Sequence, residues 1–171
     1  AFTLHSLITV TIVPVQLVQL ARSRRVRQNH ALEHATINLL ERKWGQLHLA
    51  GLSSADGFII LGFNDTKAIK EAAQSGLNQL QQGERTLAIH RECGTGRGIV
   101  HLISALVFLS LLFFTGHFSF LYIMLALAVS ALLGPLLGRF AQKALTTTTD
   151  LDKLTIESIE LLLASDHPSP F

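Results

Sequence analysis

Two histidines and a glutamate stand at a spacing that suits metal chemistry. His30, Glu33 and His34 form an H-x-x-E-H pattern within residues 28–44, a segment with the apolar spacing of a helix. Residues four positions apart share one helical face, so both imidazoles can point at a common spot. Neutral imidazoles are good ligands for zinc and similar divalent metals. Glu33 can be a further ligand or a general base beside a water activated by the ion. The pattern predicts half of a metal site.

A second stretch carries another pair of candidate ligands. His90 and Cys93 form an H-x-x-C pattern, and Gly94 and Gly96 follow it. Glycines give a loop the freedom to turn both side chains inward. With the two helix histidines, this pair would complete a closed set of three imidazoles and one thiolate, which is typical of structural zinc. If one ligand stays off the ion, a position opens for water and hydrolysis becomes feasible. Cys93 is then either a fourth ligand or a nucleophile near the metal.

Both halves also have simpler interpretations. A helix with two histidines matches the first pattern by chance, Cys93 fits an inert buried thiol, and His90 fits a strand-end histidine bonded to backbone. The two stretches nevertheless both lie beside predicted membrane segments. That shared placement favours one joint site.

The composition is too apolar for an ordinary soluble domain. Of the 171 residues, 49% are hydrophobic and only 15% are charged. Three apolar stretches, at residues 2–21, 99–114 and 118–140, approach or exceed the span of about 20 residues that a bilayer requires. We therefore expect an α-helical integral membrane protein with about three transmembrane helices and a small cytoplasmic α/β insert. For the first stretch, the alternative is a helix lying on the membrane surface.

Basic residues indicate how these segments are oriented. With three spans, the basic clusters that follow the first stretch, precede the second and follow the third all fall on one side of the membrane: Arg22, Arg24, Arg25, Arg27, Arg91, Arg97, Arg139 and Lys143. Because positive residues favour the cytoplasmic side, we expect the insert and the C-terminus in the cytoplasm. These residues do not form a nucleic-acid stripe, and the expected partner is the lipid bilayer rather than nucleic acid.

The chain divides into four predicted regions. These are an N-terminal membrane helix (1–21), a metal-site insert (22–98), a transmembrane hairpin (99–140), and a linker with an amphipathic helix and tail (141–171). Inside them we expect strands at 47–49, 58–61 and 86–89, a hairpin loop at 53–57, helices at 66–82 and 150–164, and a disordered tail at 165–171.

The sequence resembles a family of uncharacterised bacterial membrane proteins that are common in cyanobacteria. The resemblance rests on N-H-A-L-E-H-A-T-I, G-F-I-I-L-G and L-A-I-H-R-E-C-G-T ahead of the apolar hairpin, and it covers about residues 26–140. A related group with H-G-A-E-H-K and H-x-x-C-G-T is described as predicted metal-dependent enzymes. Its lysine has no counterpart after His34, so that role is not carried over. The H-x-x-E-H spacing also resembles the inverzincin motif of zinc peptidases. The resemblance implies a plasma or thylakoid membrane and candidate ligands His30, Glu33, His34, His90 and Cys93.

A histidine of the predicted transmembrane hairpin is a further candidate. His101 falls in the second apolar stretch, and an intramembrane ionisable residue is a functional candidate by default. It can bind a pigment or haem as a cofactor. Alternatively it lies at the interface, a few residues from Arg97.

Two functions fit these patterns. The first is a zinc-dependent hydrolase at the cytoplasmic membrane surface, with Glu33 as general base and a peptide or a lipid-linked ester as substrate. The second is a non-enzymatic accessory or assembly subunit of a larger membrane complex, such as a photosynthetic one. There the metal would be structural, or His101 would hold pigment or haem.

Overall fold

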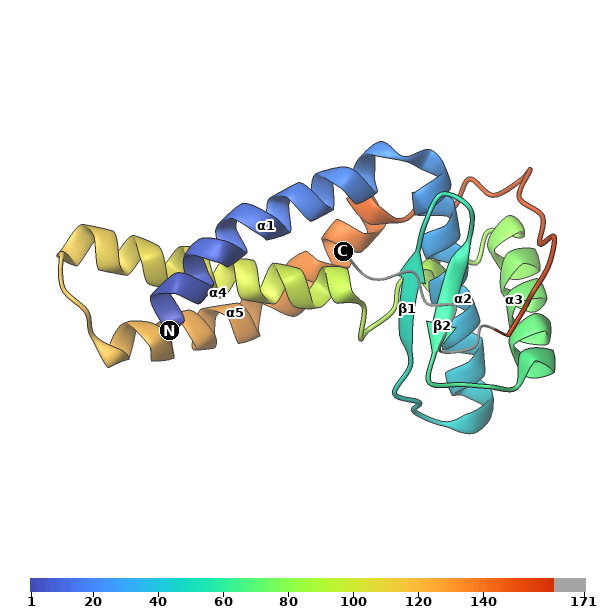
Figure 1. Ribbon diagram of the computed structural model, residues 1–171, viewed down its shortest axis with the longest axis horizontal. Helices are drawn as coiled ribbons and strands as arrows, with labels where there is room; N and C mark the ends of the chain where they lie inside the picture. The colour runs from blue at the N-terminus through green and yellow to red at the C-terminus, as the bar shows by residue number, and fades with distance from the viewer. Residues whose placement is uncertain (162–171) are drawn as a thin grey trace.

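The protein is an elongated molecule in two parts, described over residues 1–161 by a computed structural model (Figure 1). Helices α1, α4 and α5 lie together at one end, and α2, β1, β2 and α3 form the insert at the other. The elements are α1 (Phe2–Arg22), α2 (Arg24–Trp44), β1 (Ala50–Ser53), β2 (Phe58–Leu61), α3 (Thr66–Gln81), the 3₁₀ helix η1 (Arg85–Ala88), α4 (Gly94–Thr115), α5 (Phe120–Ala141) and the π-helical turn η2 (Gln142–Thr146).

The helices α1, α4 and α5 are apolar yet mostly uncovered by the rest of the chain. Their most apolar windows have mean hydropathies of 1.6, 2.3 and 2.3, and only 11%, 17% and 17% of each window is buried. A soluble domain would bury such faces, because exposed apolar surface is costly in water. All three helices are long and apolar enough to cross a membrane, which fits the predicted integral membrane protein.

Small residues bring α4 and α5 into close contact. A Cβ atom at Gly134 would lie 2.5 Å from a methyl carbon of Val100, and one at Gly138 would lie 3.1 Å from the Cα of Gly96. Small residues at such positions let two membrane helices approach closely. The start of α4 and the end of α5 are therefore held together beside the insert.

A single residue turns the chain from α1 into α2. Ser23 has an extended backbone, and its hydroxyl accepts a hydrogen bond from the Val26 N–H at 3.3 Å, capping α2. The predicted helix over 28–44 is thus confirmed and begins a turn earlier. At its other end Gly45, with φ of +83°, terminates the helix. As a result α2 lies across the end of the three apolar helices (Figure 1).

The core of the insert forms between α2, α3 and the C-terminal segment. Gly76 allows the two helices to approach, because a Cβ there would lie 3.0 Å from that of Ala35. Asp65 caps α3 through the Ala68 N–H, which agrees with the predicted helix over 66–82. The fully or nearly buried apolar residues of the main cluster are Ala31, Leu32, Ala35, Leu77, Leu80, Leu87, Ala88 and Leu151.

The β-hairpin is displaced relative to its predicted position. Its first strand is Ala50–Ser53 rather than 47–49, and it pairs antiparallel with Phe58–Leu61, Ser53 opposite Phe58. Leu47 and Leu49 instead pack against the α2–α3 cluster. Their burial against the helices outweighs the alternation that predicted a strand.

Two further predictions are wrong. Residues 86–89 form most of a 3₁₀ turn instead of a strand, because side chains of α2 take up the backbone carbonyls there. Residues 150–161, the described part of the helix predicted over 150–164, are not helical. This segment packs against α3, where the Gln81 amide donates to the carbonyls of Leu151 and Leu154. The predicted disordered tail lies outside the described residues.

Candidate metal centre

Three of the predicted ligands meet in the buried space between the insert and the apolar helices. The candidate ligand atoms of His30, His34 and Cys93 all lie within 4.8 Å of one another. The exposed fractions of these residues are 6%, 1% and 7%. Both histidines project from α2, one helical turn apart, and Cys93 is the residue that precedes α4. The two motifs, 60 residues apart in sequence, thus form one cluster.

Backbone carbonyls fix both imidazoles in the tautomer that a metal requires. The Nδ1 of His30 donates to the carbonyl of Thr146 at 3.0 Å, and that of His34 donates to the carbonyl of Ala88 at 2.8 Å. Since a carbonyl only accepts, the neutral form of each ring carries its proton on Nδ1 and its lone pair on Nε2. Metal-binding histidines are held in this way by the ring nitrogen that does not bind the ion.

One of these Nε2 atoms has no protein partner. The Nε2 of His34 is buried and unpaired among the described residues. A buried acceptor without a hydrogen bond costs roughly 1–3 kcal/mol, so such atoms are rare in folded proteins. A metal ion in the cluster would satisfy this lone pair. The residues therefore fit a bound ion.

Electrostatics favour the ligating forms of the cluster. Burial lowers the pKa of His34, which keeps its imidazole neutral. Burial acts to raise the pKa of the Cys93 thiol, but the neighbouring His34 imidazole and hydrogen bonds to Thr95 outweigh burial and lower that pKa. The Sγ atom also lies 3.4 Å from the Nε2 of His30. A neutral imidazole and an acidic thiol are the states that bind soft or borderline metals.

Glu33 lies beside the cluster but is held by the hairpin. It is 5% exposed, and its carboxylate accepts a short hydrogen bond from the Ser53 hydroxyl. Gly51 makes room for it, because a Cβ at that position would overlap the carboxyl group. Burial raises the pKa of Glu33, against smaller lowering effects of the neighbouring Ser53, His30 and His90 side chains. The predicted general-base role remains a prediction.

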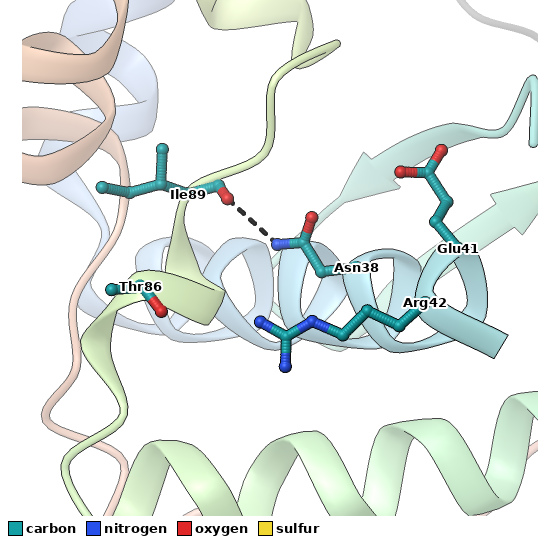
Figure 2. Close-up of a pocket in the computed structure, with 5 residues that line it drawn as sticks. All are labelled: Asn38, Glu41, Arg42, Thr86 and Ile89. Carbon is teal, nitrogen blue, oxygen red and sulfur yellow. Dashed lines mark hydrogen bonds between the residues drawn. The ribbon is translucent and has the colours of Figure 1, made fainter. Parts of the chain in front are cut away.

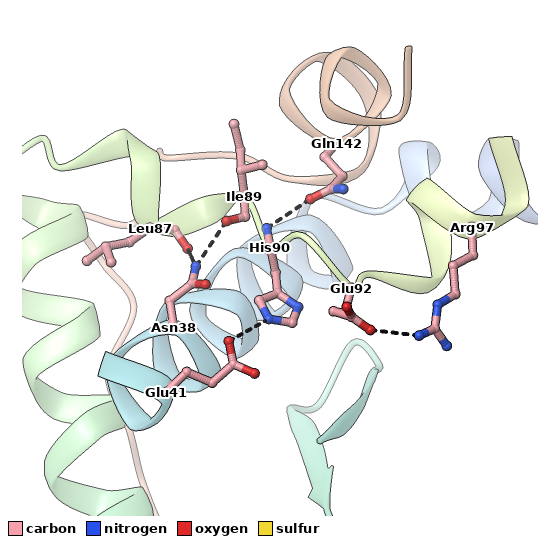
Figure 3. A network of polar contacts seen from close by, with 8 residues as sticks. All are labelled: Asn38, Glu41, Leu87, Ile89, His90, Glu92, Arg97 and Gln142. Atoms are coloured by element: carbon pink, nitrogen blue, oxygen red, sulfur yellow. Dashed lines mark hydrogen bonds and ion pairs between the residues drawn. The ribbon is translucent and has the colours of Figure 1, made fainter. Parts of the chain in front are cut away.

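His90 is near the cluster but does not converge with it. Its Nε2 lies 3.3 Å from a carboxylate oxygen of Glu41, and its backbone N–H donates to the side-chain oxygen of Gln142 at 3.0 Å (Figure 3). The ring centres of His90 and His34 are 5.9 Å apart. A role for His90 as a ligand therefore stays a prediction, and Glu41 is the partner that this ring has in the structure.

Two asparagines of α2, neither of them among the predicted site residues, hold the surrounding loops. Asn38 donates to the carbonyls of Leu87 and Ile89, both at 3.0 Å, and so fixes the segment that leads to Cys93 (Figures 2 and 3). Asn29 donates to the hairpin carbonyls of Ser54 and Ala55. A signal for Asn38 is present in the sequence, because it continues the four-residue spacing of the two histidines along α2.

The supporting residues at the end of α5 carry no such signal. Gln142 contacts the cluster's loop through its side chain, and Thr146 contacts His30 through its backbone carbonyl. The sequence had suggested only a linker there. Every residue has a carbonyl, so its use as an acceptor cannot be read from residue type.

A surface pocket adjoins the site without reaching its ligands. It has a volume of about 370 Å³ and is lined by Asn38, Glu41, Arg42, Thr86 and Ile89 (Figure 2). None of the three clustered residues lines it. Glu41 links the two regions, because it lines the pocket and also contacts His90.

His101 lies apart from the cluster, on α4. Its exposed ring meets that of His5 on α1 edge-on, with ring centres 5.9 Å apart. The predicted binding of a pigment or haem by His101 remains a prediction.

Comparisons with other proteins place this fold in a family. A family model described as "Domain of unknown function (DUF6391)" matches residues 25–159. An uncharacterized protein of Picosynechococcus sp. (strain ATCC 27264 / PCC 7002 / PR-6) is 32% identical over 166 residues, covering 85% of this chain and 77% of that protein. No solved structure matches the chain. These matches agree with the expected likeness to a largely cyanobacterial family. Because the family model extends from α2 to the C-terminal segment and includes the whole cluster, the chain belongs to the DUF6391 family.

Proposed function

We propose that this chain is an integral membrane metalloprotein whose ion is bound by the Nε2 atoms of His30 and His34 and the Sγ of Cys93. The observation that carries the proposal is the pair of Nδ1 hydrogen bonds to backbone carbonyls, which leaves an unpaired, buried Nε2 on His34. Two imidazole nitrogens and a thiolate suit zinc or a similar borderline metal. We place the insert on the cytoplasmic side because the basic residues gather beside it.

The number of converging ligands supports hydrolysis. Catalytic zinc sites use three protein ligands, and their fourth position is open. When bound, such an ion supplies a Lewis acid that activates water or polarises a carbonyl. Glu33 would take up the proton released from water and return it to the leaving group. The substrate would be a peptide or a lipid-linked ester at the membrane surface.

Burial of the cluster supports a second function. All three ligand side chains are buried, and the pocket of Figure 2 does not reach them. A buried ion would connect α2 to the segment before α4 and so join the insert to the apolar helices. The protein would then be an accessory or assembly subunit of a larger membrane complex, with a structural metal.

Metal content and coordination test the proposed site. The full chain is purified in detergent without chelators, and its metal is measured by elemental analysis and X-ray absorption. We expect about one ion per chain with two nitrogen ligands and one sulfur ligand from the protein, the number of protein ligands that catalytic zinc sites use. A His34→Ala variant should lose the ion, whereas His48→Ala, at an exposed position, should retain it. Metal-free protein with an intact fold would reject the proposal.

A conservative change at Glu33 separates the two functions. Glu33→Gln keeps the size of the side chain and should leave the metal content unchanged. Turnover is assayed with chromogenic acyl esters and peptides presented in mixed micelles. The hydrolase function predicts activity in the wild type that Glu33→Gln abolishes. A coordination shell without an exchangeable ligand, in a protein inactive on every probe, supports the structural function instead.

A further inference from the structure

The end of α5 has an unusual conformation next to the cluster. After Ala141 the helix continues as the π-helical turn Gln142–Thr146. π-Helical turns are rare in proteins, and those that occur are often found at functional sites. Gln142 is only 2% exposed and Thr146 is fully buried. A buried polar side chain such as that of Gln142 usually has a hydrogen-bond partner.

This turn holds both sides of the cluster. The side-chain oxygen of Gln142 accepts from the backbone N–H of His90 at 3.0 Å, three residues before Cys93 (Figure 3). Four residues further on, the carbonyl of Thr146 accepts from the Nδ1 of His30 at 3.0 Å. One turn of backbone thus orients an imidazole from α2 and the loop that carries the thiol.

The turn lies against the contact between the apolar helices α4 and α5. Its carbonyl at Gln142 accepts from both the N–H and the hydroxyl of Thr147 at 3.0 and 2.9 Å. The Gln142 amide nitrogen lies 3.4 Å from the position of a Cβ on Gly96, and Gly96 packs against Gly138 one turn earlier on α5. The amide therefore lies where α4 and α5 approach each other closely through Gly96 and Gly138.

We propose that Gln142 is a positioning residue of the metal centre. By accepting from the His90 N–H, its side-chain oxygen fixes the position of the His90–Cys93 loop relative to α2. The position of the loop in turn determines the distance between the thiolate and the two imidazoles. Without that acceptor the His90 N–H would be buried and unpaired, and the loop would move to find another partner. This inference rests on the proposed metal site for its ligand, but the loop geometry that it describes exists without the ion.

Binding of Co²⁺ to the full chain in detergent tests the proposal. Gln142→Leu removes the acceptor at similar size, Gln142→Glu retains an acceptor, and Gln82→Leu is the control at an exposed position. We expect Gln142→Leu to weaken Co²⁺ binding roughly 10- to 100-fold, as for other residues that orient ligands, and to diminish the thiolate-to-cobalt charge-transfer band. Gln142→Glu should restore both to the wild-type level, and the control should leave both unchanged.

Alkylation of the metal-free protein provides a second readout. Cys93 is the only cysteine of the chain, so the rate of reaction with iodoacetamide reports on this loop alone. Gln142→Leu should accelerate the reaction roughly 10-fold relative to wild type, while Gln82→Leu should not. If Gln142→Leu does not fold, Gln142→Asn, which keeps the amide but shortens its reach, takes its place with the same expectation.

The outcomes distinguish this proposal from the proposed function. A wild type that binds no Co²⁺ refutes the metal site, and the alkylation rates then decide the role of Gln142 alone. Equal alkylation rates in wild type and Gln142→Leu, with equal Co²⁺ affinity where binding occurs, would overturn the positioning role. Loss of binding in Gln142→Leu without rescue by Gln142→Glu would also count against it.

Discussion

Replacing the thiol by a hydroxyl tests the cluster with little disturbance of the fold. Cys93→Ser keeps a polar hydrogen on the same side of the residue as Sγ, which lies 3.4 Å from the Nε2 of His30. We therefore expect the stability of the metal-free protein to change by no more than about 1 kcal/mol. The metal affinity should respond much more strongly. Structural zinc contributes about 10–16 kcal/mol, so each of three ligands accounts for about 3–5 kcal/mol, or roughly 10²–10⁴ in Kd.

A thermal unfolding assay with and without zinc measures this difference. At free zinc about 1,000 times the wild-type Kd, binding stabilises the wild type by about 4.1 kcal/mol. A variant with a Kd weaker by about 10³ gains only about 0.4 kcal/mol at that concentration. For a chain of this length the zinc-induced rise in midpoint is about 8–16 °C in the wild type and about 1–2 °C in the variant.

A histidine far from the cluster provides the control for this assay. His117 is exposed in the loop between α4 and α5, so His117→Ala should show the full wild-type rise. Equal zinc-induced shifts in wild type and Cys93→Ser would refute the reasoning, because the ion would then bind without the thiolate.

Other predictions concern packing and pH. Gly51→Ala places a methyl group on the carboxyl group of Glu33 and should lower the free energy of unfolding by about 1–3 kcal/mol in chemical denaturation. Gly57→Ala, whose Cβ meets nothing within 4 Å, should have little effect, and equal losses in the two variants would contradict the close contact. Leu151→Ala truncates a fully buried side chain and should lower the free energy of unfolding by about 2–5 kcal/mol, whereas Leu161→Ala at an exposed position should change it little. A negligible loss in Leu151→Ala would mean that the C-terminal segment does not contribute to the core. Acidification should release the metal, because protons compete for the thiolate and both imidazoles. Since burial lowers the pKa of one of these imidazoles, release should occur at a lower pH than for exposed histidines, and a competition titration with a chelating dye across pH measures it.

Much of the fold could be predicted because it follows from local pattern. Long apolar stretches produced the three helices α1, α4 and α5, and Asp65 and Gly45 marked the ends of helices in the insert. A local pattern predicted the wrong element where contacts with other parts of the fold favoured a different backbone conformation. Residues 86–89 had the composition of a strand, but α2 supplied side-chain donors for their carbonyls, and the two-stranded sheet within residues 1–161 does not include them.

The sequence by itself determined that His30 and His34 share a helical face and that Cys93 follows a loop at the start of an apolar helix. Only the tertiary structure decided that Cys93, rather than His90, converges with the two imidazoles, because Gln142 and Glu41 hold His90 in another direction. It also decided the tautomer of each ring, through the carbonyls of residues 116 and 54 positions away along the chain. A carbonyl is present in every residue, so its role as an acceptor arises only when folding brings a donor to it.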